Sequence, residues 1–173
     1  MPFRITLEST TMIIGISGHQ NLGDESSVAW VADQMRRLLQ ETPFDLGSTS
    51  LAAGADQLFA EIVLELGRPF EFVSPSLHYE KAFTDPAARE KFLRLERQAK
   101  VRWDLPFSEP GGEAFLQAGQ CVVDHADLML FVWNGLPAKG RGGTADVVAY
   151  ARARGKSYLL LDPNVRSVAR VTM

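Results

Sequence analysis

The feature that most constrains the fold is the alternation of short apolar segments with longer segments of helical periodicity. Apolar runs predict strands at residues 12–17, 44–53, 70–73, 101–105, 128–133 and 157–161. Apolar residues at helical spacing predict helices at residues 28–40, 56–66, 85–99, 113–126 and 144–154. Because the strands are apolar on both faces, we expect an α/β fold: a Rossmann-like three-layer α/β/α sandwich with a mostly parallel central sheet. The tail after Asp162 matches neither pattern.

The length and composition of the chain favour one soluble domain spanning residues 1–173. Hydrophobic residues make up 46% of the chain and charged residues 23%, which is the ordinary balance of a globular protein. Residues Met1 to Arg4 carry no long apolar run, so we expect no signal peptide, no membrane span and a cytoplasmic location.

The charge balance bears on the kind of partner that the chain can bind. There are 18 Lys and Arg residues against 21 Asp and Glu residues, a formal net charge of −3. A protein dedicated to the DNA or RNA backbone usually carries a basic surplus, so a nucleic-acid partner is disfavoured. A small phosphorylated ligand needs only a local positive field and remains compatible with this composition.

Cysteine and histidine are too sparse to predict a disulfide framework or a metal site. Cys121 is the only cysteine, and His19, His78 and His125 are far apart with no zinc-ligand spacing. We interpret Cys121 as a small, buried helical residue. The imidazole of His125 is either held charged by Asp124 and Asp127 or serves to space the helix–strand junction.

In open α/β sheets, ligands bind beyond the carboxyl ends of the strands, so the loops after strands are the places to search. The first such loop contains Ser17, Gly18 and His19. Gly18 lets the backbone approach a ligand, while Ser17 and His19 supply a hydroxyl and an imidazole. The alternative is a tight turn with a solvent-facing histidine.

The second loop contains Gly54, Ala55 and Asp56, where the predicted strand 44–53 ends and the predicted helix 56–66 begins. Small residues allow the loop to pack closely, and the free amides of a helix start bind phosphate or hydroxyl groups. Asp56 is either the N-cap of that helix or a ligand contact, and the two roles are compatible.

The third loop follows the most apolar strand, and its candidate ligand-binding residues are Trp133, Asn134, Gly140, Arg141, Gly142, Gly143 and Thr144. The glycines allow several amides to converge on an anion, and Thr144 adds a hydroxyl at a helix start. Arg141 and Lys139 supply positive charge, and Trp133 either stacks on a base or packs at the rim of the core. The alternative for the loop is a flexible surface hairpin. Neither GxxxxGK[ST] nor GxGxxG is present, which disfavours Walker-type ATP hydrolysis and NAD-dependent redox chemistry.

These motifs, in this order, resemble the SLOG superfamily, the Rossmann-like group that includes DprA, the LOG phosphoribohydrolases, YpsA-like bacterial proteins and the TRPM channel N-terminal domain. The matching segments lie within residues 12–161: Gly15-Ile16-Ser17-Gly18-His19, Ala53-Gly54-Ala55-Asp56, Val123-Asp124-His125-Ala126-Asp127 and Gly142-Gly143-Thr144-Ala145-Asp146. The resemblance implies a Rossmann-like fold that binds a nucleotide or a nucleotide-derived ligand. We expect no required cofactor and, from the ligand spacing described above, no metal.

The chain departs from the LOG enzymes, which carry a PGGxGTxxE signature and a separate catalytic arginine. Only Gly142-Gly143-Thr144 matches, and Val147 stands at the position of the signature glutamate. Asp146 precedes Val147, so its side chain points about 100° away around the helix. Nothing selects the arginine among four candidates, Arg89, Arg94, Arg97 and Arg102.

Two functions therefore remain open. The first is a nucleotide-binding or nucleotide-sensing module. The second is cleavage of an N-glycosidic bond in a nucleoside 5′-monophosphate, with Asp146 or Glu113 stabilising the ribose cation or activating water. A DNA-processing role like that of DprA is disfavoured by the acidic balance. We also expect a homo-oligomer. One Rossmann-like unit of five or six strands uses nearly the whole chain, so we expect any effector to be a separate chain.

Overall fold

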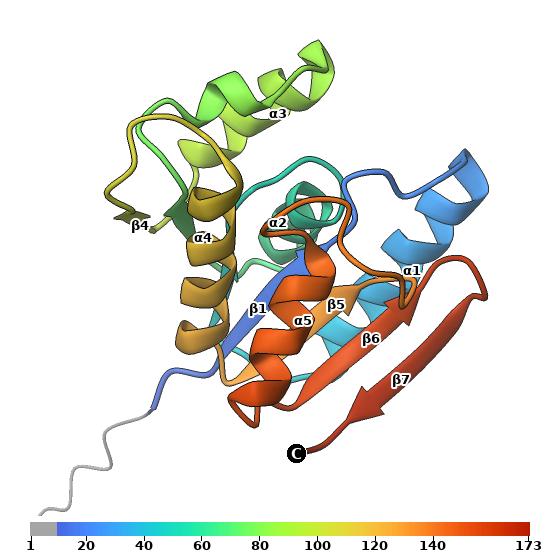
Figure 1. Cartoon of the computed structure of the whole chain (residues 1–173). Coiled ribbons are helices and arrows are strands. Elements are labelled where there is room, and N and C mark those ends of the chain that lie inside the picture. Colours follow the sequence, from blue (N-terminus) through green and yellow to red (C-terminus); the bar gives the residue numbers. More distant parts are fainter. Residues whose placement is uncertain (1–9) are drawn as a thin grey trace, which may run out of the picture.

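A central β-sheet organises the structure, a computed structural model that describes residues 10–173 (Figure 1). The residues considered above for a signal peptide lie outside this range. Within it, the strand order is β4-β3-β2-β1-β5-β6-β7. The strands are β1 (Ile13–Gly18), β2 (Leu46–Thr49), β3 (Phe70–Ser74), β4 (Val101–Asp104), β5 (Leu128–Val132), β6 (Tyr158–Asp162) and β7 (Ser167–Val171).

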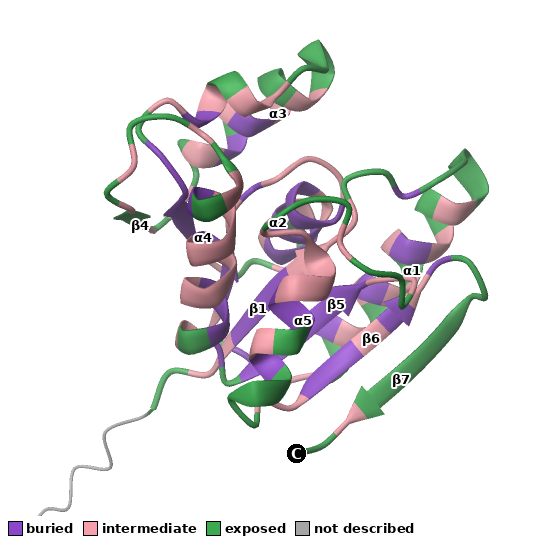
Figure 2. Cartoon of the chain, viewed as in Figure 1, coloured by how far each residue is buried: buried purple, intermediate pink, exposed green. Residues whose placement is uncertain are grey.

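Six of these strands are parallel, as the apolar runs predicted, and the seventh is an addition. Strand β7 pairs antiparallel with β6, with Asp162 opposite Ser167, so the tail after Asp162 forms a hairpin. Its side chains are mostly exposed (Figure 2), so no apolar pattern marked it in the sequence. The expectation of five or six strands was therefore wrong, because backbone pairing rather than burial defines β7.

Helices cover both faces of the sheet, which confirms the three-layer α/β/α architecture. They are α1 (Glu25–Glu41), α2 (Ala55–Glu65), α3 (Pro86–Glu96), α4 (Gly112–His125) and α5 (Thr144–Ala153), with a 3₁₀ turn η1 (Tyr79–Ala82). The first three helices pack on one core, to which β1 contributes Ile14 and Ile16. Helices α4 and α5 pack on a second core containing Met129 and Phe131 of β5.

Local contacts set two element boundaries. Helix α1 begins before residue 28 because Asp24, one of three residues (Asp24, Ser26 and Ser27) that the sequence offers as its cap, is the N-cap; its carboxylate accepts a hydrogen bond from the Ser27 amide at 2.8 Å. Strand β2 ends at Thr49 rather than Ala53 because Leu51 takes a left-handed conformation with φ 56°. A buried leucine with positive φ is a strained residue, and such residues concentrate at functional sites.

Candidate functional site

The topological switch point of the sheet lies between β1 and β5. From β1 the chain continues outward through β2 and β3, while β5 continues outward through β6 on the other side. The loops after β1 and β5 flank this point, and the loop after β2 lies beside them; Figure 1 shows the beginnings of α2 and α5 in the same part of the molecule. The three loops singled out in the sequence thus meet at the position where such folds bind ligands.

The β1 loop is joined directly to the β5 loop. The amide of His19 donates to the carbonyl of Val132 at 3.0 Å, and the amide of Asn134 donates to Nε2 of His19 at 3.0 Å. Since Nε2 accepts, the ring proton of the neutral imidazole is on Nδ1. Burial lowers the pKa of His19. His19 is therefore a neutral bridge between two loops rather than the solvent-facing residue of the alternative.

The β2 loop is locked against the β1 loop through Gly54. This residue has φ 80°, and a side chain on it would collide with the backbone carbonyls of His19 and Gln20. The amide of Ala55 donates to the carbonyl of His19 at 3.1 Å. Gly18 packs against Ala55 in the same region, so both glycines permit close contact between protein segments. The loops form one interlocked unit.

Asp56 does not cap α2, so the capping interpretation was wrong. The N-cap is Gly54, and Asp56 lies in the first turn, where its carboxylate accepts a long hydrogen bond of 3.4 Å from the Ala52 amide. Asp56 is 5% exposed, and burial raises its pKa to about 7, which hydrogen bonding from the loop only partly offsets. Nearby, Ser50 Oγ is buried and has no partner within residues 10–173. The loop thus holds incompletely satisfied polar groups.

The β5 loop places two free amides at the beginning of α5. Gly143 is the N-cap and makes no side-chain capping bond, and the amides of Thr144 and Ala145 have no partner among the described residues. The preceding residue, Gly142, has φ 83° and lies so close to α4 that a side chain would meet the Leu116 amide at 2.6 Å. The loop is consequently held by packing on α4 and is not a loose hairpin.

Both candidate catalytic carboxylates are engaged by this same loop. Asp146 accepts a hydrogen bond from the Gly142 amide at 2.8 Å. Glu113, in the first turn of α4, accepts from Nε of Arg141 at 2.7 Å, and this bond lowers the pKa of Glu113. Of the amides expected to converge on an anion, the one at Gly142 is thus already occupied by the protein's own carboxylate.

The aromatic and amide side chains at the end of β5 support the loop. The indole N–H of Trp133 donates to the carbonyl of Leu136 at 2.8 Å, and the guanidinium of Arg152 lies 5.8 Å from its ring centroid. The side chain of Asn134 accepts from the Leu136 amide at 3.1 Å. Trp133 also packs on the α4–α5 core, which fits the rim-packing alternative better than base stacking.

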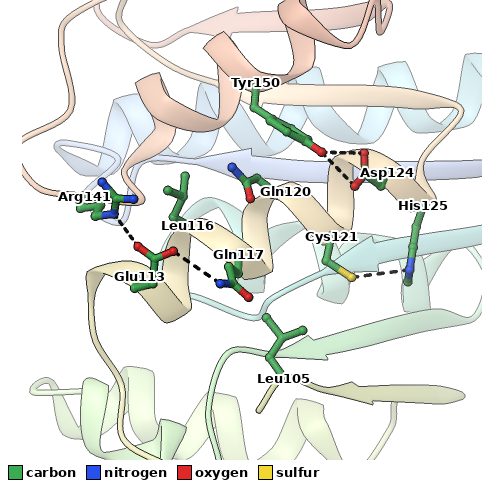
Figure 3. Close-up of a pocket in the computed structure, with 10 residues that line it drawn as sticks. All are labelled: Leu105, Glu113, Leu116, Gln117, Gln120, Cys121, Asp124, His125, Arg141 and Tyr150. Atoms are coloured by element: carbon green, nitrogen blue, oxygen red, sulfur yellow. Dashed lines mark hydrogen bonds and ion pairs between the residues drawn. The ribbon is translucent and has the colours of Figure 1, made fainter. Parts of the chain in front are cut away.

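A shallow groove of about 430 Å³ runs along α4 (Figure 3). Its lining includes Arg141 of the β5 loop and Glu113 at the beginning of α4, and it reaches Cys121 and His125 at the other end of the helix. His125 bonds to Glu71 rather than to Asp124 or Asp127, so its expected partners were wrong. Sequence reasoning missed Glu71, although one charged residue inside the apolar run Phe70-Glu71-Phe72-Val73 was a usable signal.

The described part of the chain offers neither a metal-ligand cluster nor a helix that could span a membrane. No group of three or more His, Cys, Asp or Glu side chains within residues 10–173 is arranged to hold a metal ion. None of the helices in that range combines the length and hydrophobicity required to cross a bilayer.

Fold and switch-point loops together define a Rossmann-like protein with its candidate site at the strand ends. No protein-family model and no curated protein matches the chain. Solved structures do match. DNA processing protein A (DprA) from Streptococcus pneumoniae has a TM-score of 0.62 at 13% identity, covering 88% of this chain and 50% of that one. DprA from Helicobacter pylori has a TM-score of 0.63 at 18% identity, covering 88% and 66%.

A third similar structure is the molybdenum cofactor binding protein from Rippkaea orientalis, with a TM-score of 0.57 at 15% identity, covering 88% of this chain and 77% of that one. At these identities the likeness concerns the fold, and this chain spans about half the length of the pneumococcal protein. The Rossmann-like fold that the motifs implied is confirmed, and the similar structures include DprA, which the resemblance had named.

Proposed function

We propose that the chain binds a small phosphorylated, nucleotide-derived ligand at the carboxyl ends of β1, β2 and β5, as a binding or sensing module. The observation that carries this proposal is that the amides of Thr144 and Ala145, at the switch point, have no hydrogen-bond partner within residues 10–173. A helix start offers a phosphate both hydrogen-bond donors and a favourable dipole. Thr144 adds a hydroxyl group at the same place.

The remaining parts of the ligand would lie over the interlocked β1 and β2 loops. His19, Gly54 and Asp56 surround this region, and the carboxyl group of Asp56 is poised to change protonation near neutral pH. A ribose hydroxyl is a suitable partner for a carboxyl group in either protonation state, because the group can accept or donate. Lys139 and Arg141 supply local positive charge beside this region, although the net charge of the whole chain is −3.

The environment of Asp146 and Glu113 supports binding over catalysis. Each carboxylate accepts a hydrogen bond from the loop itself, Asp146 from Gly142 and Glu113 from Arg141. In addition, Val147, at the position of the LOG glutamate, is 2% exposed and packs in the core. An incoming phosphate must therefore compete with Asp146 for loop amides, and we expect modest affinity.

A panel of ligands tests the proposal by thermal shift. The panel contains nucleoside monophosphates, diphosphates, triphosphates and cyclic nucleotides, with the corresponding nucleosides as controls that lack phosphate. A ligand at 100 times its dissociation constant adds roughly 2.7 kcal/mol to the free energy of unfolding. Absence of a shift with every phosphorylated compound would refute the proposal.

Two other outcomes separate the competing functions. Release of free base from a nucleoside monophosphate, lost in Asp146→Asn, would establish the N-glycosidase alternative. The Helicobacter pylori structure concerns a single-stranded DNA binding mode, so single-stranded DNA belongs in the panel; salt-sensitive binding would indicate that partner despite the acidic balance. The homo-oligomer and the separate effector chain stay predictions, which light scattering of the purified protein addresses first.

A further inference from the structure

A buried carboxylate lies within the sheet, away from the switch-point loops. Glu71 of β3 is 3% exposed and accepts three hydrogen bonds: from Ser48 Oγ at 2.7 Å, from Trp103 Nε1 at 2.8 Å and from His125 Nδ1 at 2.7 Å. An ionised carboxylate is costly to bury and needs such donors. Phe70, Phe72 and Val73 of the same strand are apolar and fully buried, so the carboxylate among them calls for another explanation.

The hydrogen bond from His125 to Glu71 directs the other ring nitrogen at Cys121. The carboxylate can only accept, so Nδ1 carries a proton, and in the neutral imidazole Nε2 then keeps its lone pair. Cys121 Sγ lies 3.5 Å from Nε2, one helical turn before His125 on α4 (Figure 3). Cys121, His125 and Glu71 thus form a relay in which a thiol faces a proton acceptor that a buried carboxylate orients.

This relay opens onto the groove along α4. Cys121 and His125 both line it, together with Gln117, Gln120 and Asp124 from the same helix. Cys121 is half-buried, so its sulfur is open to a molecule lying in the groove. A volume of about 430 Å³ is of the size that small-molecule sites have.

The position of Cys121 within a helix limits the chemistry. It lies in the interior of α4 (Gly112–His125), where backbone amides are used by the helix itself. No backbone donors are therefore free there to stabilise the oxyanion of an acyl-transfer reaction. Attack of sulfur on a disulfide develops no such oxyanion, and it needs only a thiolate and an accessible path.

We propose that Cys121 is a thiol-modification site that exchanges with low-molecular-weight disulfides bound in the α4 groove, with His125 as proton acceptor and Glu71 as its positioning residue. The Cys121 sulfur attacks one sulfur of the disulfide R–S–S–R while its proton passes to Nε2 of His125. The R–S bond to the second sulfur remains intact, the S–S bond breaks, and the leaving thiolate takes the proton from His125 as R–SH. The products are a mixed disulfide on Cys121 and one free thiol.

The electrostatic setting makes the proton acceptor necessary. Burial raises the pKa of the Cys121 thiol, and the carboxylates of Glu71 and Asp124 raise it further. The resting group is therefore a thiol, and the reaction needs His125 to remove its proton. A thiolate released from a less acidic thiol is also the stronger nucleophile.

The test follows the reaction of the full chain with cystamine by mass spectrometry, and Cys121 is the only cysteine that can react. The reference is a synthetic peptide of residues 117–124, which contains Cys121 without His125 or Glu71. We expect the folded protein to react at least about tenfold faster than the peptide, a small part of the about 10²- to 10⁴-fold that positioned general bases contribute. A folded protein that reacts no faster than the peptide overturns the proposal, with no variant required.

His125→Asn sharpens the test, because the asparagine amide can still donate to Glu71 but provides no base beside Cys121. We expect its reaction rate to fall to that of the peptide or below. The matched control is His78→Asn, which changes an exposed histidine near η1 outside the groove and should leave the rate unchanged. Equal rates in wild type and a folded His125→Asn would exclude the role of His125.

The pH dependence of the rate tests Glu71. The groups around His125 are Glu71 of β3, the Trp103 ring of β4, and Cys121 and Asp124 of α4; Tyr150 and Arg154 of α5 engage Asp124, and Lys156 bonds to the Ala126 carbonyl. In wild type we expect the rate to rise at a lower pH than in the peptide. In a folded Glu71→Leu, which leaves His125 Nδ1 without its acceptor, we expect this advantage over the peptide to be lost. An unchanged profile would contradict the positioning role.

Discussion

We expect that replacing Thr144 by proline removes a donor of the proposed phosphate site and leaves the fold intact. Thr144 is the first residue of α5, where proline is favoured, and its amide has no partner among the described residues. Gly143 before it is extended, with φ −68° and ψ 171°, which is the conformation that a following proline requires. We expect the free energy of unfolding to stay unchanged or to rise by about 0.4–1 kcal/mol, because proline restricts the unfolded chain.

The same substitution should weaken binding of a phosphorylated ligand. A hydrogen bond to a charged group contributes about 1.5–3 kcal/mol, and Thr144→Pro deletes the amide donor together with the hydroxyl. The loss of one such bond corresponds to an increase in Kd of about 10- to 150-fold. Calorimetric titration with the nucleotide that gives the largest thermal shift measures this change, and urea denaturation measures the stability.

The control is Thr144→Ser, which keeps both the amide and the hydroxyl and should bind as wild type does. A proline variant with wild-type stability and wild-type affinity would refute the phosphate position at α5. A proline variant that loses stability would instead refute the inference that the Thr144 amide is free.

Three further predictions follow from the loops. Asp146→Asn keeps an acceptor for the Gly142 amide but removes a negative charge, so affinity for the same nucleotide should rise several-fold in titration; a fall would favour a direct role of Asp146 in binding or catalysis. Burial raises the folded-state pKa of Asp56 to about 7, so the stability of the wild type falls as pH rises from about 4 to about 7 and this group ionises first in the unfolded chain. In urea denaturation, the stability advantage of Asp56→Asn over wild type should therefore be larger at pH 8 than at pH 5. An equal advantage at both pH values would count against the raised pKa. Gly54→Ala should unfold the chain or cost well over the about 1 kcal/mol expected for Gly67→Ala, which has φ 70° but open space around it; similar melting temperatures would contradict the close packing of the loops.

The sequence predicted the elements that are buried, because burial leaves a periodic pattern. Most of the parallel strands and the five α-helices have buried apolar faces, although β4 is mostly exposed. Gly18, Gly54 and Gly142 lie at or after strand ends, where segments pack closely. Strand β7 has no buried face and could not be predicted in this way. Backbone pairing with β6 leaves no signature in a single sequence.

The candidate site was predicted in position but not in its internal contacts. Glycine-bearing loops after parallel strands fix where a site lies, whereas the partner of Asp56, Asp146 or His125 depends on which segments the fold brings together. Glu71 and His125 are 54 residues apart and meet only because α4 crosses β3. A charged residue inside an apolar strand signals such a contact, but it does not identify the partner.

The pairing of β1 with β5 has a consequence for how the protein is made. Its register joins Ile14 to Leu128, and it brings together the two halves of the loop unit around the switch point. Contacts so distant in sequence carry a high loop-closure entropy and form late in folding. During synthesis the edge of β1 that faces β5 stays unpaired until Leu128 has left the ribosome, so the candidate site at the switch point is completed only when the last strands of the chain have been made. Nascent chains shorter than this expose a bare parallel-sheet edge, the form in which such proteins are most prone to aggregate.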